Sequence, residues 1–392
     1  MMARPTPIYE IEQDFYVPHF EVKVRDRDLP DDVIRDVMQV TYRDKVNEID
    51  SFELMVNNWD AEARKLKYEP PVQQRYEHLF DPGQKLELRM GYVNDLHLMV
   101  TGEITTLEPN YPESGGPTLS VRGLNVLHAF RGEQHTWSWD DRRDSDIARW
   151  LGRRPVRRGQ PGLGIRVETD PVPEERPETY VFMDNQYDIV FLRDRARRHD
   201  YELVLREEER NGRREQYLYF GPSESRRQAP TYRLEWGKSL ISFRPTLSTT
   251  RQISEVCVRG WDRRRNRRIE ECARWQDLHP RRSPERSRME RLAQAFGNRR
   301  EIITNRPVHT RAEARDLARR ILRRQLKEMV QASGATVGLP GLRAGRKVEI
   351  VGLGLRFDGE YYITETTHTI GDSGYRTTFS ARREGSVQGA AQ

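Results

Sequence analysis

The sequence predicts a mainly β protein in which two similar β-domains flank a small α+β domain. Three observations support this prediction. Segments with alternating apolar and polar residues occur towards both ends of the chain, helical patterns and a hairpin pattern occur in its middle, and the two β-rich parts share motifs in the same order. Alternation with a period of two is typical of half-buried strands, and regular turn signals between such strands favour a barrel or a sandwich.

The first β-domain is expected over residues 15–131, after an N-terminal extension over residues 1–14. Asp81-Pro-Gly83 and Ser114-Gly-Gly-Pro117 supply turn signals between its strands. The strand patterns lie at 20–25, 51–56, 84–89 and 117–122.

The middle domain, residues 132–235, carries helical patterns. An acidic start predicts a short helix at 144–151, and Asp184 or Asn185 is expected to cap a second helix that runs to about His199. The alternating segments 201–205 and 216–220 then predict a hairpin around Asn211-Gly212.

The second β-domain is expected over residues 236–384, followed by a flexible tail at 385–392. A basic insertion at 263–306 interrupts its strands. A helix is expected at 310–333, because Thr310-Arg-Ala-Glu313 forms a capping box and Gly334 follows as a C-cap glycine. The strand patterns lie at 239–243, 254–259, 347–351, 360–364 and 375–381.

The two β-rich parts look like copies of one unit. Any single match between them is weak, but four matches in the same order at comparable gaps indicate a duplicated β-domain. The matched segments are 21–25 with 255–259, 83–88 with 345–350, Gly102-Glu103 with Gly359-Glu360, and 118–122 with 378–382.

Composition and targeting signals fit a folded component of an assembly. The chain of 392 residues is polar, with 33% charged residues. It has no apolar run long enough for a transmembrane helix and no signal-peptide pattern, so we expect synthesis in a reducing cytoplasm. Cys257 and Cys272 are too few for a disulfide framework or a four-ligand zinc site, and Cys257 is expected to be a small core residue.

Enzyme motifs are missing from the sequence or incomplete. It contains no His-Glu-x-x-His, Gly-x-Ser-x-Gly or Cys-x-x-Cys motif, and the segment 341–347 has the wrong glycine spacing for a phosphate loop. His368 is expected to be a barrel or interface residue, and Asp140-Asp141 a solvated pair in a loop. The sequence therefore predicts no catalytic residue, no metal site and no cofactor.

A basic segment is the feature with the most open function. Residues 263–300 hold 13 Arg and 5 acidic residues, and this excess is larger than the net charge of the whole chain, +6. A solvated excursion or a docking strip for a neighbouring subunit is one hypothesis. A nucleic-acid contact, in which Trp261, Trp275 and Phe296 stack on bases, is a second, and a membrane-surface contact is a third. The strip consists of Arg263, Arg264, Arg265, Arg267 and Arg268.

Several motifs together resemble the phage late control protein D family, the baseplate hub proteins of contractile tails and of type VI secretion spikes. The resemblance spans nearly the whole chain and is most specific in its last two thirds. The motifs are 184–193, Trp236-Gly-Lys-Ser-Leu-Ile-Ser-Phe243, Val258-Arg-Gly-Trp-Asp262, 334–345, 357–363 and Thr367-His368 before 374–379.

The resemblance implies a homotrimer with two β-barrel tube domains per chain, so that six quasi-equivalent barrels form a ring between a six-fold inner tube and a three-fold spike. The implied partners are further copies of the chain, an inner tube protein, a separate spike protein, other baseplate proteins and cargo in the lumen, with no membrane insertion. The strands expected at the barrel seams carry Val22, Val24, Val256, Val258, Val348 and Ile350.

The sequence departs from that family in two respects. No Gly/Val-rich spike repeat follows the second β-domain, so the spike is expected to be a separate polypeptide, and the basic insertion has no counterpart in the family pattern. The main alternative function is a nucleic-acid-binding protein that uses residues 263–300. A tail-tip peptidoglycan hydrolase is a further alternative, but it needs a catalytic constellation that the motifs do not supply.

Overall fold

The computed structural model describes most of the chain. The described residues are 7, 8, 15, 17–69, 76, 78–210, 213–223, 230–250, 252–278, 286, 290, 299–354 and 356–384. The N-terminal extension, the tail at 385–392 and much of the basic insertion after residue 278 therefore lie largely or wholly outside them.

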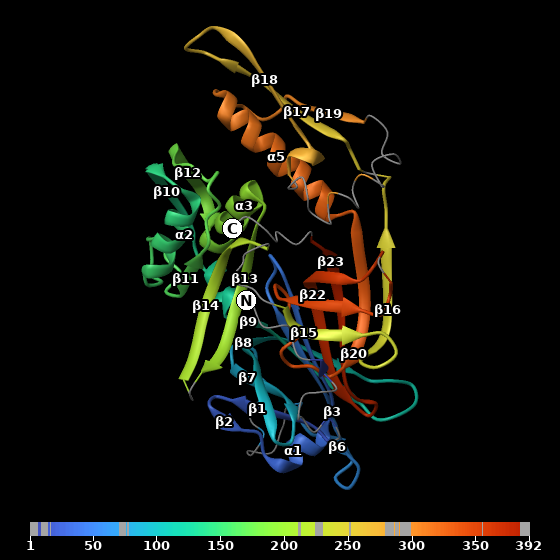
Figure 1. Ribbon diagram of the computed structural model, residues 1–392. Helices are drawn as coiled ribbons and strands as arrows, with labels where there is room; N and C mark the ends of the chain where they lie inside the picture. The colour runs from blue at the N-terminus through green and yellow to red at the C-terminus, as the bar shows by residue number, and fades with distance from the viewer. Residues whose placement is uncertain are drawn as a thin grey trace.

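One large sheet organises the molecule (Figure 1). It has 13 strands, and its main path runs β16-β20-β23-β22-β3-β4-β9-β8-β7-β1-β2, with β15 and β21 attached beside β22. The strands from the first part of the chain are β1 (Pro18–Val24), β2 (Arg27–Asp28), β3 (Val37–Lys45), β4 (Ser51–Asn57), β7 (Lys85–Tyr92), β8 (Asp95–Asn110) and β9 (Thr118–Asn125). Those from the last part are β15 (Pro230–Glu235), β16 (Leu240–Leu247), β20 (Val330–Val337), β21 (Lys347–Val351), β22 (Gly359–Gly371) and β23 (Gly374–Arg383).

Short elements complete the first part. Buried residues of β1, β3, β4, β7, β8 and β9 form its apolar core, which Val33 of helix α1 closes. The short elements are α1 (Asp31–Asp36), β5 (Trp59–Asp60), β6 (Lys65–Leu66) and the 3₁₀ helix η3 (Val126–Arg131).

The middle domain packs two helices against short sheets around a core of its own. Its first helix begins at the predicted Asp144, whereas the second begins at Asp188, because 184–187 belong to strand β12. The predicted hairpin is present as β13 and β14, although its tip, 211–212, is outside the described residues. The elements are β10 (Gln134–Arg142), α2 (Asp144–Arg153), β11 (Arg166–Thr169), β12 (Glu178–Tyr187), α3 (Asp188–His199), β13 (Tyr201–Arg210) and β14 (Arg213–Pro222).

A separate unit is inserted between β16 and β20. Its three-stranded sheet has the order β18-β17-β19, and the long helix α5 packs against β17 and β18 (Figure 1). We refer to residues 248–329 as the insert. Its described elements are β17 (Glu255–Asp262), β18 (Arg267–Arg274), the 3₁₀ helix η4 (Trp275–Asp277), β19 (Arg300–Ile303) and α5 (Arg311–Lys327).

Helix α5 ends before the predicted residue 333. Thr310 caps its N-terminus as expected, by accepting a hydrogen bond from the Glu313 amide, but Gly334 lies inside strand β20 rather than at the C-cap. A Cβ atom at Gly334 would lie 2.5 Å from the Phe379 ring, so the glycine lets that ring pack against the strand. The prediction of a C-cap was wrong because this glycine serves packing instead.

Candidate docking site and the joints that carry it

The predicted arginine strip lies at the tip of the hairpin formed by β17 and β18. All five arginines, Arg263–Arg265, Arg267 and Arg268, are exposed. The Asp262 carboxylate accepts hydrogen bonds from the backbone amides of Arg264 and Arg265, both at 3.1 Å, and this shapes the turn. Asn266 completes the turn with a φ of 45°, a left-handed conformation that asparagine tolerates well.

Three of the five arginines have no ion pair with a described residue. Arg268 pairs with Glu270, and Arg265 lies 3.9 Å from Asp262. No ion pair with a described residue involves Arg263, Arg264 or Arg267, and the Trp261 side chain beside them is 50% exposed. A projecting tip with unpaired guanidinium groups and an aromatic ring is suited to a partner that offers acidic groups.

The hairpin is held rigid from below by a small apolar core. Val256 and Val258 of β17 pack with Ile269 of β18 against the buried face of α5, which presents Leu317 and Leu322. Opposite charges tie the same helix to β18, because Glu271 accepts from Arg315 at 3.0 Å. The tip therefore extends from a packed unit.

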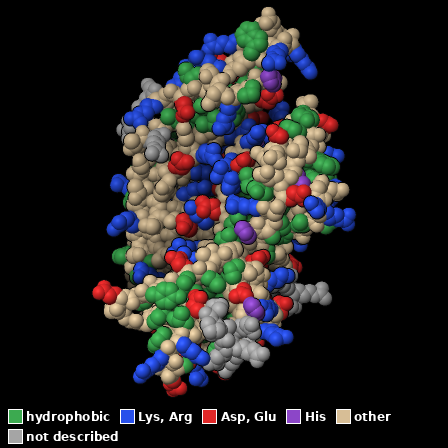
Figure 2. Space-filling view, turned by 180° about the vertical axis from the view of Figure 1, so that it is seen from behind, with side chains coloured by type: hydrophobic (Ala, Val, Ile, Leu, Met, Phe, Trp, Pro, Cys, Tyr) green, Lys and Arg blue, Asp and Glu red, His purple; other side chains and the backbone are tan. Residues whose placement is uncertain are grey.

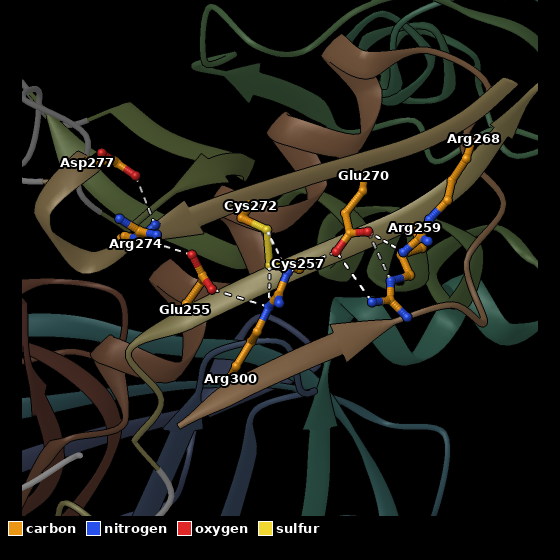
Figure 3. The surroundings of a disulfide bond; sticks show 9 residues. All are labelled: Glu255, Cys257, Arg259, Arg268, Glu270, Cys272, Arg274, Asp277 and Arg300. Carbon is orange, nitrogen blue, oxygen red and sulfur yellow. Dashed lines mark hydrogen bonds and ion pairs between the residues drawn. A yellow bond between two sulfur atoms is a disulfide. The ribbon is translucent and has the colours of Figure 1, made fainter. Parts of the chain in front are cut away.

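A disulfide crosslinks the two strands of the hairpin (Figure 3). Cys257 and Cys272 face each other directly in the antiparallel ladder and are bonded. Cys257 is buried, as expected for a small core residue, but it is bonded to Cys272, a pairing that was not predicted because sequence spacing does not give the register of a hairpin. In Figure 3 the Arg300 side chain reaches from β19 to the disulfide, and its Nε lies 3.0 Å from the Cys257 sulfur.

The residues predicted for the barrel seams lie in three separate places. Val22 and Val24 lie on β1, which pairs with β7, while Val348 and Ile350 lie on β21, between β15 and β22. All four are buried. Strand β17, with Val256 and Val258, is not in the large sheet at all, so these two valines are not seam residues; an alternating pattern shows that a segment is a strand but not which sheet it joins.

The two halves of the large sheet repeat one strand order. In the first half the neighbours run β3-β4-β9-β8-β7, and in the second they run β16-β20-β23-β22-β21. Corresponding strands also follow one another in the same order along the chain. We call these sets the first and the second half.

Two β-bulges occur at corresponding positions of the halves. One interrupts β3 between Val37 and Gln39 and β16 between Leu240 and Ser242. The other interrupts β8 between Ile104 and Thr106 and β22 between Ile363 and Glu365. A bulge inserts one residue and re-aims the strand, so its recurrence at equivalent places supports duplication of one unit.

The bulges and ladders also correct the sequence matches. Segment 83–88 matches 345–350 in the structural register, because Leu86 pairs with Gly102 as Val348 pairs with Tyr361. Thr118, however, corresponds to Arg376 rather than Thr378, and Gly102 to Tyr361 rather than Gly359. Both sequence matches were displaced by two residues, a displacement that leaves the alternation unchanged. The match of 21–25 with 255–259 joins strands of different sheets and is wrong.

The halves meet where β22 pairs with β3, along 365–370 and 40–45. We call this pairing the internal seam. Buried charges stabilise it: the Asp44 carboxylate accepts from Arg343 Nε at 2.7 Å and from the Ala344 amide at 3.2 Å. Arg343 also donates to the Tyr42 hydroxyl and, at 2.9 Å, to the Met99 carbonyl, so a single guanidinium joins both halves.

The pKa values of two titratable groups beside this ion pair are shifted in the direction that favours their neutral forms. Burial, with Asp44 close by, raises the pKa of Asp50 to about 7. Burial lowers the pKa of His368 to about 4. The His368 ring lies 3.0 Å from the Leu342 carbonyl through Nε2 and 3.0 Å from the Tyr375 hydroxyl through Nδ1, so a neutral imidazole satisfies both neighbours. The prediction that His368 is a barrel or interface residue agrees with this place at the internal seam.

A second joint connects the insert, the middle domain and both halves. Lys327 of α5 donates to Asp200 at 2.7 Å, and Arg382 of β23 donates to Glu202 at 2.6 Å. Glu202 also accepts from Asn47 of the first half. These groups border a cavity of about 280 Å³. On the face shown in Figure 2, Lys and Arg side chains gather in a hollow in the upper half of the molecule.

Two groups of described residues have donor atoms close enough to hold a metal ion, but in one of them, Glu255 with Cys257 and Cys272, the two sulfur atoms are bonded to each other. Asp144, Glu178 and His199 offer one ligand atom each within 4.8 Å of one another. Arg195 occupies the site, because it pairs with Asp144 and, at 2.6 Å, with Glu178. A guanidinium at this place supplies the positive charge that an ion would supply, so the cluster is a structural ion-pair network. Asp140 and Asp141 are exposed, as predicted, but they lie on strand β10 and not in a loop, and they are not part of this network.

The groups at the two joints were hard to predict from the sequence. Asp44 could have been noticed, because a carboxylate occupies an inward-facing position of an otherwise regular strand. Nothing in the motifs pointed to Arg343, Lys327 or Arg382, since their partners lie far away along the chain.

Comparisons with known proteins identify the fold. A family model that describes the Alg8 N-terminal domain matches residues 221–372, which is less than half of the chain and does not assign a family to it. No curated protein matches the sequence. Of the part of the chain that the structure describes, no helix has the length and apolar character needed to cross a membrane.

Solved structures of tail proteins share the architecture over nearly the whole chain. The prophage MuSo2 43 kDa tail protein from Shewanella oneidensis is 14% identical, with a TM-score of 0.64, and the match covers 93% of this chain and 98% of that one. A tail protein from Neisseria meningitidis MC58 is 12% identical, with a TM-score of 0.63 and coverage of 94% and 98%.

A component of a type VI secretion system has a similar architecture. The E. coli c3393 protein, a component of the type VI secretion system, is 12% identical, with a TM-score of 0.56 and coverage of 95% and 79%. At these identities the likeness concerns the fold: the chain has the mainly β architecture of phage tail proteins.

Proposed function

We propose that this chain is a structural baseplate subunit of a phage-tail-like contractile particle, namely its hub. Three copies form a ring that joins a six-fold inner tube to a three-fold spike. The observation that carries the proposal is the duplicated half, with one strand order and two pairs of matching bulges. Three chains with two equivalent halves each present six similar surfaces to the tube and three whole chains to the spike.

Two further observations support this role. The solved structures with the same fold include phage tail proteins and a type VI secretion component. The sequence motifs resemble the late control protein D family, whose members are hubs. The partners of the chain are then other copies of itself, an inner tube protein, a separate spike protein and other baseplate proteins, and cargo passes through the lumen. Catalysis and cofactors have no part in the proposal.

The mechanism is mechanical. A hub transmits force between tube and spike, so its two halves must not rotate relative to each other. The internal seam meets this need with a strand ladder and the buried Asp44–Arg343 pair, and the joint around Lys327 and Arg382 fixes the middle domain and the insert to the same frame. Assembled particles are the site of action, and the chain is made in the cytoplasm.

Mass photometry of the purified chain, alone and together with the tube and spike proteins encoded beside it, tests the proposal. We expect a species of about three times 46.2 kDa that appears as a ring in negative stain. A chain that stays monomeric in the presence of those proteins would exclude the hub.

Nucleic-acid binding is the second candidate function, and one observation favours it. The half-exposed Trp261 is close in sequence to Arg263, Arg264 and Arg267, which have no ion pair with a described residue, and such a segment can stack on a base between phosphate contacts. Retention of DNA or RNA that falls steeply with salt, and that is lost when the five tip arginines become serine, would support it. Retention unaffected by those changes would exclude it.

A further inference from the structure

Two long strand edges of the large sheet, those of β16 and of the end of β8, lack a partner strand within the part of the chain that the structure describes. Strand β16 pairs with β20, and apart from an isolated bridge between Leu240 and Trp236 it has no second strand partner among the described residues. Strand β8 pairs with β7 through residues 95–103 and with β9 through residues 102–110, so beyond Glu103 its side away from β9 has little strand cover. A free edge is a template for another strand, and such edges are either protected or used for assembly.

The correspondence between the two halves predicts which strand edge pairs with which. In the internal seam, β22 of the second half pairs with β3 of the first half. Strand β8 is the counterpart of β22, and β16 is the counterpart of β3. The contact equivalent to the internal seam would therefore join β8 to β16. Within one chain six strands, β20-β23-β22-β3-β4-β9, separate β16 from β8 in the sheet, and the two strands do not pair, so we take them from different copies.

We infer that in the assembled ring the end of β8 in one copy pairs antiparallel with the free edge of β16 in the next copy. The inference rests on the proposed trimer and specifies its partner surface. Because each copy offers one edge of each kind, the contact is head-to-tail, and a ring closes when the rotation between copies allows it. The internal seam and the seam between copies then alternate around the ring.

The bulges set the register of this second seam. Residue 106 corresponds to 365, and 242 corresponds to 39, as the first residues after equivalent bulges. Transferring the pairs of the internal seam gives a complete set of partners. These are Thr106 with Ser248, Leu107 with Leu247, Glu108 with Thr246, Pro109 with Pro245, Asn110 with Arg244, and Tyr111 with Phe243.

The side chains that this register brings together are compatible on both faces. One face joins leucine to leucine, proline to proline and tyrosine to phenylalanine, whereas the other joins only polar residues. Leu107, Phe243 and Leu247 already lie at the margins of the apolar cores, and Tyr111, 60% exposed in the single chain, would be covered. A register shifted by one residue would set apolar side chains against polar ones.

The seam between copies differs from the internal seam at its centre. Pro109 and Pro245 stand where the internal seam has His368 and Tyr42. The Val46 amide donates to the carbonyl of Thr364, the residue opposite it in the register of the internal seam. Since hydrogen-bonded and non-hydrogen-bonded pairs alternate along an antiparallel ladder, His368 and Tyr42 also form a hydrogen-bonded pair. Two prolines have no amide proton to exchange. The seam between copies is therefore weaker, and in the single chain the prolines limit uncontrolled strand addition at these edges.

A pair of engineered cysteines tests the register. Glu108 and Thr246 are exposed, and they form a pair of the non-hydrogen-bonded kind, whose Cα atoms come within reach of a disulfide. The variant Glu108→Cys/Thr246→Cys, oxidised mildly with the native disulfide kept, should yield covalent dimers and trimers on a non-reducing gel. The matched control Glu108→Cys/Leu247→Cys has the same number of cysteines but places the two thiols on opposite faces of the seam, and it should stay unlinked.

The outcomes separate this inference from the proposed function. Linked trimers with the first variant and none with the control support the register. If the parent chain forms trimers by mass photometry but the first variant does not link, the inference is wrong and the hub proposal stands. If the parent chain never associates, both fail. As a second measurement, Tyr111→Asp should raise the concentration needed for half-assembly about tenfold while leaving the melting temperature of the single chain unchanged; an unchanged assembly concentration would contradict the inference.

Discussion

The two halves of the large sheet differ most at one connection. In the first half, β3 and β4 are joined by the short turn 46–50, whereas in the second half the equivalent β16 and β20 are joined by the whole insert, residues 248–329. One unit was thus duplicated, and one copy carries an additional folded module at a turn. Insertions at turns leave the ladders of a sheet intact, so in the proposed assembly the sheet would remain available for contacts between copies while the insert would be available for docking.

The comparison also separates two kinds of stabilisation. The seam between the halves is stabilised by buried charges that no neighbouring residue in sequence supplies, whereas the insert is stabilised locally by its disulfide and by the face of α5. Loss of a seam group should therefore affect both halves, and loss of an insert group should affect the insert alone.

The largest effect is expected from Arg343→Ala. This change leaves the Asp44 carboxylate buried without its partner, and breaking a buried pair in this way costs about 3–5 kcal/mol. Urea denaturation followed by circular dichroism measures the loss. Arg149→Ala, which removes an exposed arginine paired with Asp146 on the same helix, is the control and should change the free energy of unfolding by less than about 0.5 kcal/mol. A loss under about 1 kcal/mol for Arg343→Ala would show that the pair does not hold the halves together.

A smaller and local effect is expected from Cys257→Ala/Cys272→Ala. The disulfide closes a loop with a sequence separation of 15, and a crosslink of this size stabilises a fold by about 3 kcal/mol. Amide hydrogen exchange should accelerate in β17 and β18 and stay unchanged in β3 and β4. Reduction of the parent chain with a thiol should have the same effect. Equal acceleration in both sheets would mean that the insert and the large sheet unfold as one unit.

The pH dependence of stability should have two opposing components at the internal seam. His368 has its pKa lowered to about 4, below the unfolded value of 6.5. Its contribution to the free energy of unfolding is therefore fully present above pH 6.5 and is lost as the pH falls towards 4. Asp50 has its pKa raised to about 7, above the unfolded value of 3.8. Its contribution to the free energy of unfolding is therefore fully present below pH 3.8 and is lost as the pH rises towards 7.

Two substitutions separate these components. His368→Gln should remove the loss of stability that occurs as the pH falls, and Asp50→Asn should remove the loss of stability that occurs as the pH rises towards 7. For each group the free energy of unfolding should change by at most about 1.4 kcal/mol per pH unit. Melting temperatures recorded across this pH range for the parent and both variants provide the measurement. Slopes that change in the same direction in both variants would contradict the assignment.

The sequence predicted the class of fold and the duplication, because alternation and turn residues are local signals. It placed two of the four repeat matches two residues out of register, since a displacement of two keeps every side chain on its face. It also assigned β17 to the wrong sheet, because a strand pattern records burial but no partner. The structural register, by contrast, could be read from the bulges, which have no distinct sequence signal.

The candidate functional groups also divide into those that the sequence could predict and those that it could not. The arginine strip was visible in the sequence because its charge is concentrated in a short segment, and the structure places it at an exposed tip. Arg343, Lys327 and Arg382 were invisible because each is one arginine or lysine among 67, and only the fold brings it to a distant carboxylate. Long-range pairing is what a single sequence records least.

The smallest effect on stability, with the largest expected effect on docking, concerns the free arginines of the tip. The triple variant Arg263→Ser/Arg264→Ser/Arg267→Ser removes three exposed groups that have no ion pair among the described residues, so the free energy of unfolding should change by less than about 0.5 kcal/mol. Co-purification with the other baseplate proteins should nevertheless fall. The matched triple Arg142→Ser/Arg157→Ser/Arg158→Ser removes the same charge from exposed positions of the middle domain and should leave co-purification unchanged. Equal losses for both triples would mean that net charge, and not the hairpin tip, governs association, and the insert would then lose its role as the docking module of the second half.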